Sequence, residues 1–197
     1  MLRKSVYPKV ESLLNRIASN LNQKGFTPNQ LTLAGLAINL VAGVIYASGH
    51  FFIAAVVTLI AALGDLLDGP LARTSGKVTK FGAFLDSTVD RYSDFFLFGG
   101  VALFFAKNDE SFWFVMTLMV IAGSFVTSYS KARAENLIEN CSAGLFERAE
   151  RIIVLCLGSL IWPLLTTAIF ILAIGTNATA IHRILFTRKV LSQNTDK

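Results

Sequence analysis

Long apolar stretches alternate with short polar segments along most of the chain. A helix of about 20 apolar residues is long enough to cross the hydrocarbon core of a bilayer. The pattern predicts six such helices, over residues 30–48, 51–71, 81–106, 111–134, 144–161 and 164–188. The last two come from one uncharged stretch, 152–181, which is too long for a simple span, and Trp162 and Pro163 offer a break near its middle.

The first 28 residues have a different pattern, in which basic side chains alternate with apolar ones. The basic residues are Arg3, Lys4, Lys9, Arg16 and Lys24. No continuous apolar run of the kind found in a cleavable signal is present. We therefore expect an amphipathic helix in the membrane interface, with the chain entering the bilayer near Thr27 and Pro28. The predicted organisation is one all-α domain over 1–197, with an interfacial helix in 1–28 and a six-helix transmembrane bundle in 29–190.

Composition supports a polytopic membrane protein. Hydrophobic residues make up 53% of the chain and charged residues 16%, whereas soluble domains have about 25% charged residues. The net charge of +5 comes from basic residues between apolar stretches, where topology and anionic lipid head groups explain them. The sequence contains no motif typical of a nucleic-acid partner.

The positions of the basic residues predict an orientation. Of the 18 Lys and Arg residues, only Lys107 falls in a connection assigned to the outer side, and Arg91 lies within a span. All others fall on the opposite side. The positive-inside rule then places both termini in the cytoplasm and the protein in the cell membrane. The acidic residues described next lie toward that cytoplasmic side.

Four aspartates interrupt the second and third apolar stretches. Asp65 and Asp68 are three residues apart near the end of one, and Asp86 and Asp90 are four apart near the start of the next, so each pair shares a helix face. A tight loop makes the two helices antiparallel, which lets the pairs converge. Because like charges repel and ionisable groups in a membrane are costly, we expect a bound hard cation, Mg²⁺ or Mn²⁺.

Two other interpretations of these acids remain. Arg73 and Arg91 could form salt bridges between the helices, although two arginines cannot neutralise five aspartates once Asp94 is counted. An ion-coupled membrane transporter would also keep acids within the membrane, usually near the midplane. The position of these acids near one face, beside loops that contain glycine, favours an interfacial enzyme.

The residues around the acids carry a family resemblance. Residues 65–73 read DLLDGPLAR, and Gly82, Asp86 and Asp90 follow at fixed spacing. This pattern resembles the signature of the CDP-alcohol phosphotransferases at all eight of its fixed positions. The family transfers a phosphatidyl-type group from a CDP-linked lipid to an alcohol and releases CMP, in phospholipid biosynthesis.

The resemblance implies a role for each matching position. Asp65, Asp68 and Asp86 would bind one metal ion, and Asp90 would join them at a second. Asp90 would act as general base for the acceptor hydroxyl or would orient that hydroxyl. The residues implied to contact the CDP-lipid are Asn29, Thr32, Asp68, Gly69, Ala72, Arg73 and Gly82. For Pro28, Asn29 and Thr32, ordinary helix capping is the alternative.

Basic residues in the second half predict the acceptor. Lys131 and Arg133 end the fourth span, Arg148 and Arg151 open the fifth, and Arg183 comes near the end of the sixth. Snorkelling could explain each alone, but together they could form a pocket for an acceptor that carries a phosphate.

The surrounding segments resemble the phosphatidylinositol phosphate synthase branch of the family and its archaeal ether-lipid relatives. That resemblance implies that Lys131, Arg133, Arg151 and Arg183 bind inositol phosphate, and it favours a homodimer. Glycerol 3-phosphate is the alternative acceptor. Apolar helices do not show whether the donor carries diacylglycerol or an ether lipid.

Overall fold

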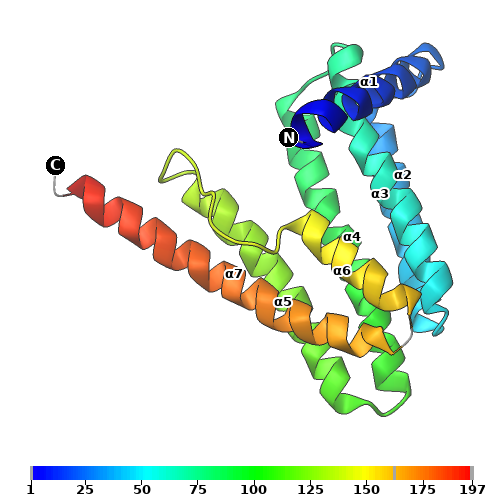
Figure 1. Cartoon of the computed structure of the whole chain (residues 1–197), viewed down its shortest axis with the longest axis vertical. Helices are drawn as coiled ribbons and strands as arrows, with labels where there is room; N and C mark the ends of the chain where they lie inside the picture. Colours follow the sequence, from blue (N-terminus) through cyan, green and yellow to red (C-terminus); the bar gives the residue numbers. More distant parts are fainter. Residues whose placement is uncertain (1, 162, 196–197) are drawn as a thin grey trace.

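The computed structural model describes residues 2–161 and 163–195. This part of the chain forms seven α-helices and contains no strand, which confirms the all-α prediction (Figure 1). The helices are α1 (Leu2–Gln23), α2 (Pro28–Ala47), α3 (Phe51–Thr74), α4 (Lys80–Lys107), α5 (Ser111–Ala134), α6 (Arg148–Leu160) and α7 (Leu164–Thr195).

Local capping fixes where α2 and α4 begin. Thr27 and Gln30 form a capping box at the start of α2, in which the Thr27 N–H donates to Gln30 Oε1 at 2.9 Å. Thr79 Oγ1 accepts the Gly82 N–H at the start of α4. The connections 48–50, 75–79 and 108–110 are short, so α2 to α5 run antiparallel in turn. The end of α3 and the start of α4 therefore lie at the end of the bundle that α1 crosses (Figure 1).

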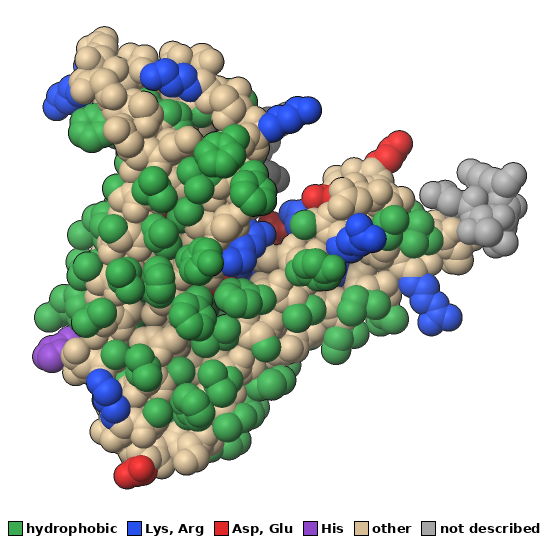
Figure 2. Space-filling model, turned by 180° about the vertical axis from the view of Figure 1, so that it is seen from behind, with side chains coloured by type: hydrophobic (Ala, Val, Ile, Leu, Met, Phe, Trp, Pro, Cys, Tyr) green, Lys and Arg blue, Asp and Glu red, His purple; other side chains and the backbone are tan. Residues whose placement is uncertain are grey.

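The outer surface of the helices is apolar. Exposed large apolar side chains lie on every helix from α2 to α7, and Figure 2 shows them spread over the middle of one face, with basic side chains at the upper end and beside a hollow. Within the described residues, four helices are long and apolar enough to cross a membrane, namely α2, α3, α5 and α7. This surface is the one expected of a protein embedded in lipid.

Two of the six predicted spans differ from this description. Helix α4 has 28 residues, but it carries Asp86, Asp90, Arg91 and Asp94. Helix α6 has only 13 residues and is about 20 Å long at 1.5 Å per residue. That is short of the roughly 30 Å hydrocarbon core. The six helices are thus present, and four of them qualify as spans by length and composition.

The fifth predicted span corresponds to α6, which begins at Arg148 instead of the predicted residue 144. Gly144 has a positive φ of 109°, and the neighbouring backbone groups bond to α7 in place of a helical partner. The Phe146 N–H donates to Thr179 Oγ1 at 3.2 Å, and Arg183 Nε donates to the Ala143 carbonyl at 2.8 Å. Tertiary contacts therefore hold segment 135–147 in an irregular conformation.

Other helix boundaries agree with the prediction or differ from it by up to seven residues. Helix α6 ends at Leu160 and α7 begins at Leu164, on either side of the predicted break, while Trp162 lies outside the described residues. Helix α7 continues to Thr195, beyond the predicted 188. Helix α1 ends at Gln23, before Gly25 adopts a φ of 82°.

Candidate active site

The four predicted aspartates converge. Asp65 and Asp68 come from α3, and Asp86 and Asp90 from α4, and all four side chains are partly buried. Asp86 is close enough to act electrostatically on each of the other three. The antiparallel pair of helices therefore brings the two pairs of acids together, as the spacing predicted.

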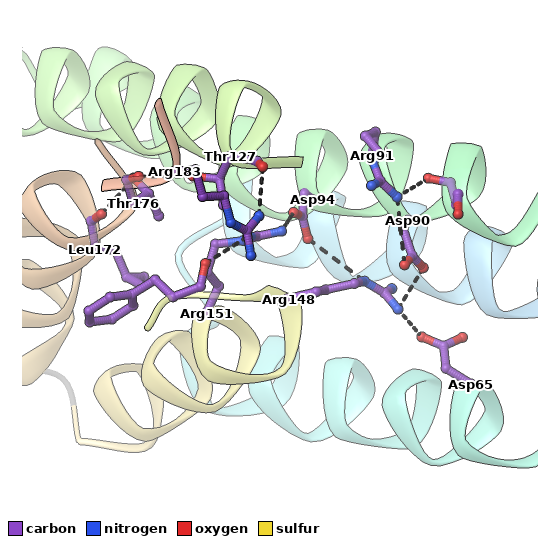
Figure 3. Close-up of polar contacts among 12 residues, drawn as sticks. Asp65, Asp90, Arg91, Asp94, Thr127, Arg148, Arg151, Leu172, Thr176 and Arg183 are labelled. Atoms are coloured by element: carbon purple, nitrogen blue, oxygen red, sulfur yellow. Dashed lines mark hydrogen bonds and ion pairs between the residues drawn. The ribbon is translucent and has the colours of Figure 1, made fainter. Parts of the chain in front are cut away.

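An arginine from α6 pairs with two of these acids. Arg148 Nη1 lies 2.8 Å from Asp65 Oδ2 and 2.7 Å from Asp90 Oδ1 (Figure 3). The salt-bridge interpretation named Arg73 and Arg91 instead. Arg91 approaches Asp90 only to 3.9 Å and also donates to the Ser87 carbonyl, while Arg73 lines a cavity described below. The acids are thus paired with arginine, but the arginine that contacts them most closely is Arg148, from a helix far away in the sequence.

The donor atoms of this cluster suit a hard divalent cation. All four acids offer carboxylate oxygens, the ligands that Mg²⁺ and Mn²⁺ prefer. Asp65, Asp68, Asp86 and Asp90 therefore fit a hard cation by the chemistry of their oxygens. Within the described residues, no three His, Cys or acidic side chains are grouped so that they could hold a metal ion, and Asp65 and Asp90 each point an oxygen at Arg148.

A cavity of about 330 Å³ opens on one side of the cluster, between α2, α3 and α4. All seven residues predicted to contact the CDP-lipid line it, which are Asn29, Thr32, Asp68, Gly69, Ala72, Arg73 and Gly82. Thr32 Oγ1 is 3.5 Å from Asp68 Oδ2, so the start of α2 faces the acids. We call this space the glycine-arginine cavity.

A second cavity, of about 310 Å³, lies on the other side of the cluster. Asp90, Lys131, Arg151 and Arg183 line it together with Arg91 and Arg148. Arg133 is exposed and is not among its lining residues. The structure therefore brings three of the four predicted phosphate-binding residues beside Asp90. We call this space the basic cavity.

The basic side chains that line this cavity already have acidic partners. Arg151 is 2% exposed, and its Nη2 lies 2.5 Å from Asp94 Oδ2 (Figure 3). Its Nη1 donates to the Phe146 carbonyl. The pair with Asp94 neutralises a buried charge, so Arg151 holds α6 to α4 as well as facing the cavity.

Arg183 and Lys131 share a carboxylate. Lys131 Nζ and Arg183 Nη2 each lie 2.8 Å from Glu147 Oε1. The hydrogen bond from Lys131 is the main reason that the pKa of Glu147 is lowered. Arg183 also donates to the Thr127 carbonyl (Figure 3). Glu147 therefore holds in place Lys131 and Arg183, two of the cations that face the basic cavity.

A third cavity, of about 380 Å³, is lined mainly by apolar side chains of α3 and α6, with Asp65 and Arg148 at its edge. The acids thus stand where three different environments meet. Asp68 and Asp86 face the glycine-arginine cavity, Asp90 faces the basic cavity, and Asp65 borders the apolar one.

The sequence did not identify three residues of this site as partners of its charged groups. The sequence pattern groups Arg148 with the basic pocket and not with the acids, and it assigns Glu147 no role in the site. Gly35 of α2 carried no signal, although a Cβ there would lie 2.8 Å from Asp65 Oδ1. Arg148 and Glu147 could have been singled out from the sequence, because they stand beside Arg151 at the start of an amphipathic helix.

The partly buried acids lie between a cavity lined by glycine and arginine and a second, basic cavity. This arrangement indicates the class of protein: a helical membrane enzyme that acts on phosphate compounds. The chain belongs to the CDP-alcohol phosphatidyltransferase family, whose sequence model matches residues 26–183. It is therefore a transferase of that family.

Individual relatives agree over nearly the whole length. An archaetidylinositol phosphate synthase of Pyrococcus horikoshii is 40% identical over 187 residues, covering 94% of this chain and 96% of the relative. A phosphatidylinositol phosphate synthase of Streptomyces avermitilis is 34% identical, covering 96% and 83%.

Solved structures of phosphatidylinositol phosphate synthase from Mycobacterium tuberculosis share the fold. The one with CDP-DAG bound has a TM-score of 0.84 and 31% identity, covering 89% of this chain and 94% of that one. The one in complex with manganese and citrate has a TM-score of 0.82 and 32% identity, covering 88% of each chain.

Proposed function

We propose that this enzyme transfers a phosphatidyl-type group from a CDP-linked lipid to inositol phosphate and releases CMP. One observation carries the proposal: the four aspartates lie between a cavity suited to a nucleotide and a cavity suited to a phosphorylated acceptor. Two of the relatives named above are synthases of inositol phosphate lipids, and one solved structure has CDP-DAG bound.

The donor would occupy the glycine-arginine cavity. Gly69 and Gly82 leave room for a nucleotide to approach the backbone, and Arg73 can pair with its phosphates. The apolar cavity beside Asp65 offers space for a hydrocarbon chain of the donor. Together they would place the pyrophosphate of the donor at the acids.

In the reaction, the acceptor hydroxyl would attack the phosphorus that bears the lipid. The new phosphorus–oxygen bond forms as the bond to CMP breaks, and the hydroxyl proton leaves. A divalent cation held by Asp65, Asp68, Asp86 and Asp90, and in our proposal a second beside it, would neutralise charge on the pyrophosphate. The chain itself binds, orients and screens the two substrates.

Asp90 is the acid placed to meet the acceptor, because it lines the basic cavity. We propose that it accepts the proton of the hydroxyl or orients that hydroxyl, provided one oxygen is free of the cation. An Asp90→Asn variant that binds metal and turns over at the normal rate would exclude the base role.

The basic cavity favours an acceptor with its own phosphate. Lys131 and Arg183 converge on one carboxylate oxygen, which is the position a phosphate oxygen would take, and Arg148 and Arg151 lie nearby. Arg133, which lies outside this lining, stays a predicted contact. The same chemistry suits glycerol 3-phosphate, the second candidate acceptor.

Purified enzyme supplied with CDP-diacylglycerol tests the choice. We expect CMP release with inositol phosphate, and little with free inositol, because inositol brings no phosphate to the basic cavity. Turnover with glycerol 3-phosphate and none with inositol phosphate would transfer the assignment to a phosphatidylglycerol phosphate synthase. Running the same assay with an archaeal-type CDP-ether lipid compares the two donors.

We also propose how the enzyme lies in the membrane. All six helices from α2 to α7 would be embedded in the cell membrane, with α1 in the interface and the acids toward the cytoplasm. Because α6 is short, it would span the bilayer only together with the irregular segment that precedes it and the first residues of α7. A homodimer is our proposed assembly, and light scattering on the detergent-solubilised enzyme should then give the mass of two chains.

A further inference from the structure

Arg148 faces acids from two helices. Its Nη1 contacts both Asp65 of α3 and Asp90 of α4, at 2.8 and 2.7 Å. Its Nε is buried and has no hydrogen-bond partner within the described residues, and Asp94 Oδ1 lies 3.9 Å from it. The guanidinium thus supplies charge to the cluster through one nitrogen, while a second donor of the same group is left unsatisfied.

The same side chain borders the neighbouring cavities. Arg148 lines the basic cavity beside Lys131 and the apolar cavity beside Ile152. Rotation about its own side-chain bonds could therefore carry the guanidinium from the acids into the basic cavity while α6 stays in place.

A divalent cation and this guanidinium compete for the same oxygens. Asp65 and Asp90 each give an oxygen to Arg148, and both are proposed metal ligands. Two positive groups within a few ångströms of one another in a partly buried site would repel strongly. Metal can enter fully only if Arg148 leaves.

We propose that Arg148 is the counter-ion of the metal-free acids, that it is exchanged for the divalent cation, and that the released guanidinium then pairs with the phosphate of the acceptor. This inference rests on the proposed function, which makes Asp65 and Asp90 metal ligands. Exchange makes metal binding and phosphate binding favour each other, since each stabilises the same position of Arg148.

Titration of the full chain in lipid nanodiscs with Mn²⁺, following free Mn²⁺ by electron paramagnetic resonance, tests the exchange without turnover. Arg148→Gln should bind Mn²⁺ at least about tenfold more tightly than the wild type, because charge-assisted contacts no longer compete. Arg188→Gln, which removes the same charge from an exposed position on α7, should match the wild type. Unchanged or weaker Mn²⁺ binding in Arg148→Gln would overturn the proposal.

Arg148→Lys guards against a folding defect in the Gln variant. It keeps the positive charge but has a shorter reach, so its Mn²⁺ affinity should fall between those of the wild type and Arg148→Gln. An affinity equal to or below that of the wild type would count against the exchange even where Arg148→Gln does not fold.

Inorganic phosphate tests the second half of the proposal. In the wild type, Mn²⁺ should tighten phosphate binding at least about fivefold, the lower range of typical couplings. The effect should disappear in Arg148→Gln. Equal coupling in the two proteins would show that Arg148 does not pair with the phosphate.

An Asp68→Asn variant distinguishes a failure of the proposed exchange from a failure of the proposed metal site. Asp68 lines the glycine-arginine cavity, on the other side of the cluster from the basic cavity, and its loss should greatly weaken Mn²⁺ binding. Normal Mn²⁺ binding by this variant would refute the metal assignment itself. Lost binding there, together with unchanged binding in Arg148→Gln, would refute only the exchange.

Discussion

Asp65 is confined from two sides by groups that its own helix does not supply. Arg148 of α6 holds its Oδ2 at 2.8 Å, and Gly35 of α2 leaves the space in which its Oδ1 lies. The position of this proposed metal ligand is therefore set by neighbouring helices, which is how a site gains precision from its scaffold.

Gly35→Ala tests that confinement. A Cβ at Gly35 would lie 2.8 Å from Asp65 Oδ1, and the carboxylate, being the end of a side chain, would move. We expect CMP release to fall by about 100-fold, the scale of a 1 Å misplacement, while thermal unfolding changes little. Gly64→Ala is the control, since a Cβ there meets nothing within 4 Å. Normal turnover in Gly35→Ala would contradict the account.

Glu147 makes the stability of the protein depend on pH in the acid range. Its lowered pKa means that the stabilisation it provides is complete above the ordinary glutamate pKa of 4.5 that applies in the unfolded chain. That stabilisation is lost as the pH falls through the lower folded-state value. The difference in thermal stability between wild type and Glu147→Gln should therefore be largest near neutral pH and shrink below about pH 4. Glu150→Gln, which removes an exposed acid from the first turn of α6, is the matched control and should show no such trend.

The residues of the donor side could be predicted from the sequence because they sit in one local pattern. Asp65 to Arg73 and Gly82 to Asp90 belong to adjacent helices, so spacing alone places them together. The partners of the acids could not be predicted in this way. Arg148 lies 83 residues after Asp65, and only the packing of α6 against α3 and α4 brings them into contact.

At the level of helices, α2 and α4 cross closely at Gly43 and Gly100. A Cβ on Gly43 would lie 2.3 Å from the Phe96 carbonyl oxygen, and one on Gly100 would lie 2.1 Å from the Gly43 carbonyl oxygen. Small residues permit this approach of two backbones.

Gly100→Ala should therefore separate these helices, at a cost of about 1–3 kcal/mol for overpacking. Its neighbour Gly99 is a matched control, because a Cβ there meets nothing within 4 Å. Gly99→Ala should be neutral or slightly stabilising, by up to about 1 kcal/mol. Thermal unfolding in detergent measures both, and equal melting temperatures for the two variants would disprove the close crossing.

Apolar periodicity located α2 to α5 within a few residues, since short polar turns separate them. It failed for the start of α6. Apolar residues occur both in helices and in irregular segments, so hydrophobicity alone does not distinguish the two. The hydrogen bonds that keep 144–147 out of the helix come from Thr179 and Arg183 on α7. Tertiary hydrogen bonds of this kind leave no periodic trace in sequence.

At the scale of the whole molecule, the charge distribution predicts which end faces the cytoplasm. Single cysteines at Asn108 and Lys77 probe the two ends, because Cys141 and Cys156 are both buried. In sealed right-side-out vesicles, a membrane-impermeant maleimide should label Asn108→Cys but not Lys77→Cys. Labelling of Lys77→Cys alone would invert the proposed orientation.

We propose that the four aspartates hold the divalent metal on which transfer from the CDP-linked lipid depends. CMP release by purified enzyme with CDP-diacylglycerol and inositol phosphate, measured after EDTA treatment and then after Mg²⁺ or Mn²⁺ is restored, tests this dependence. We expect EDTA to abolish CMP release, either ion to restore it in the wild type, and neither to restore it in Asp86→Asn. Undiminished CMP release after complete metal removal, or full activity of Asp86→Asn, would contradict this account.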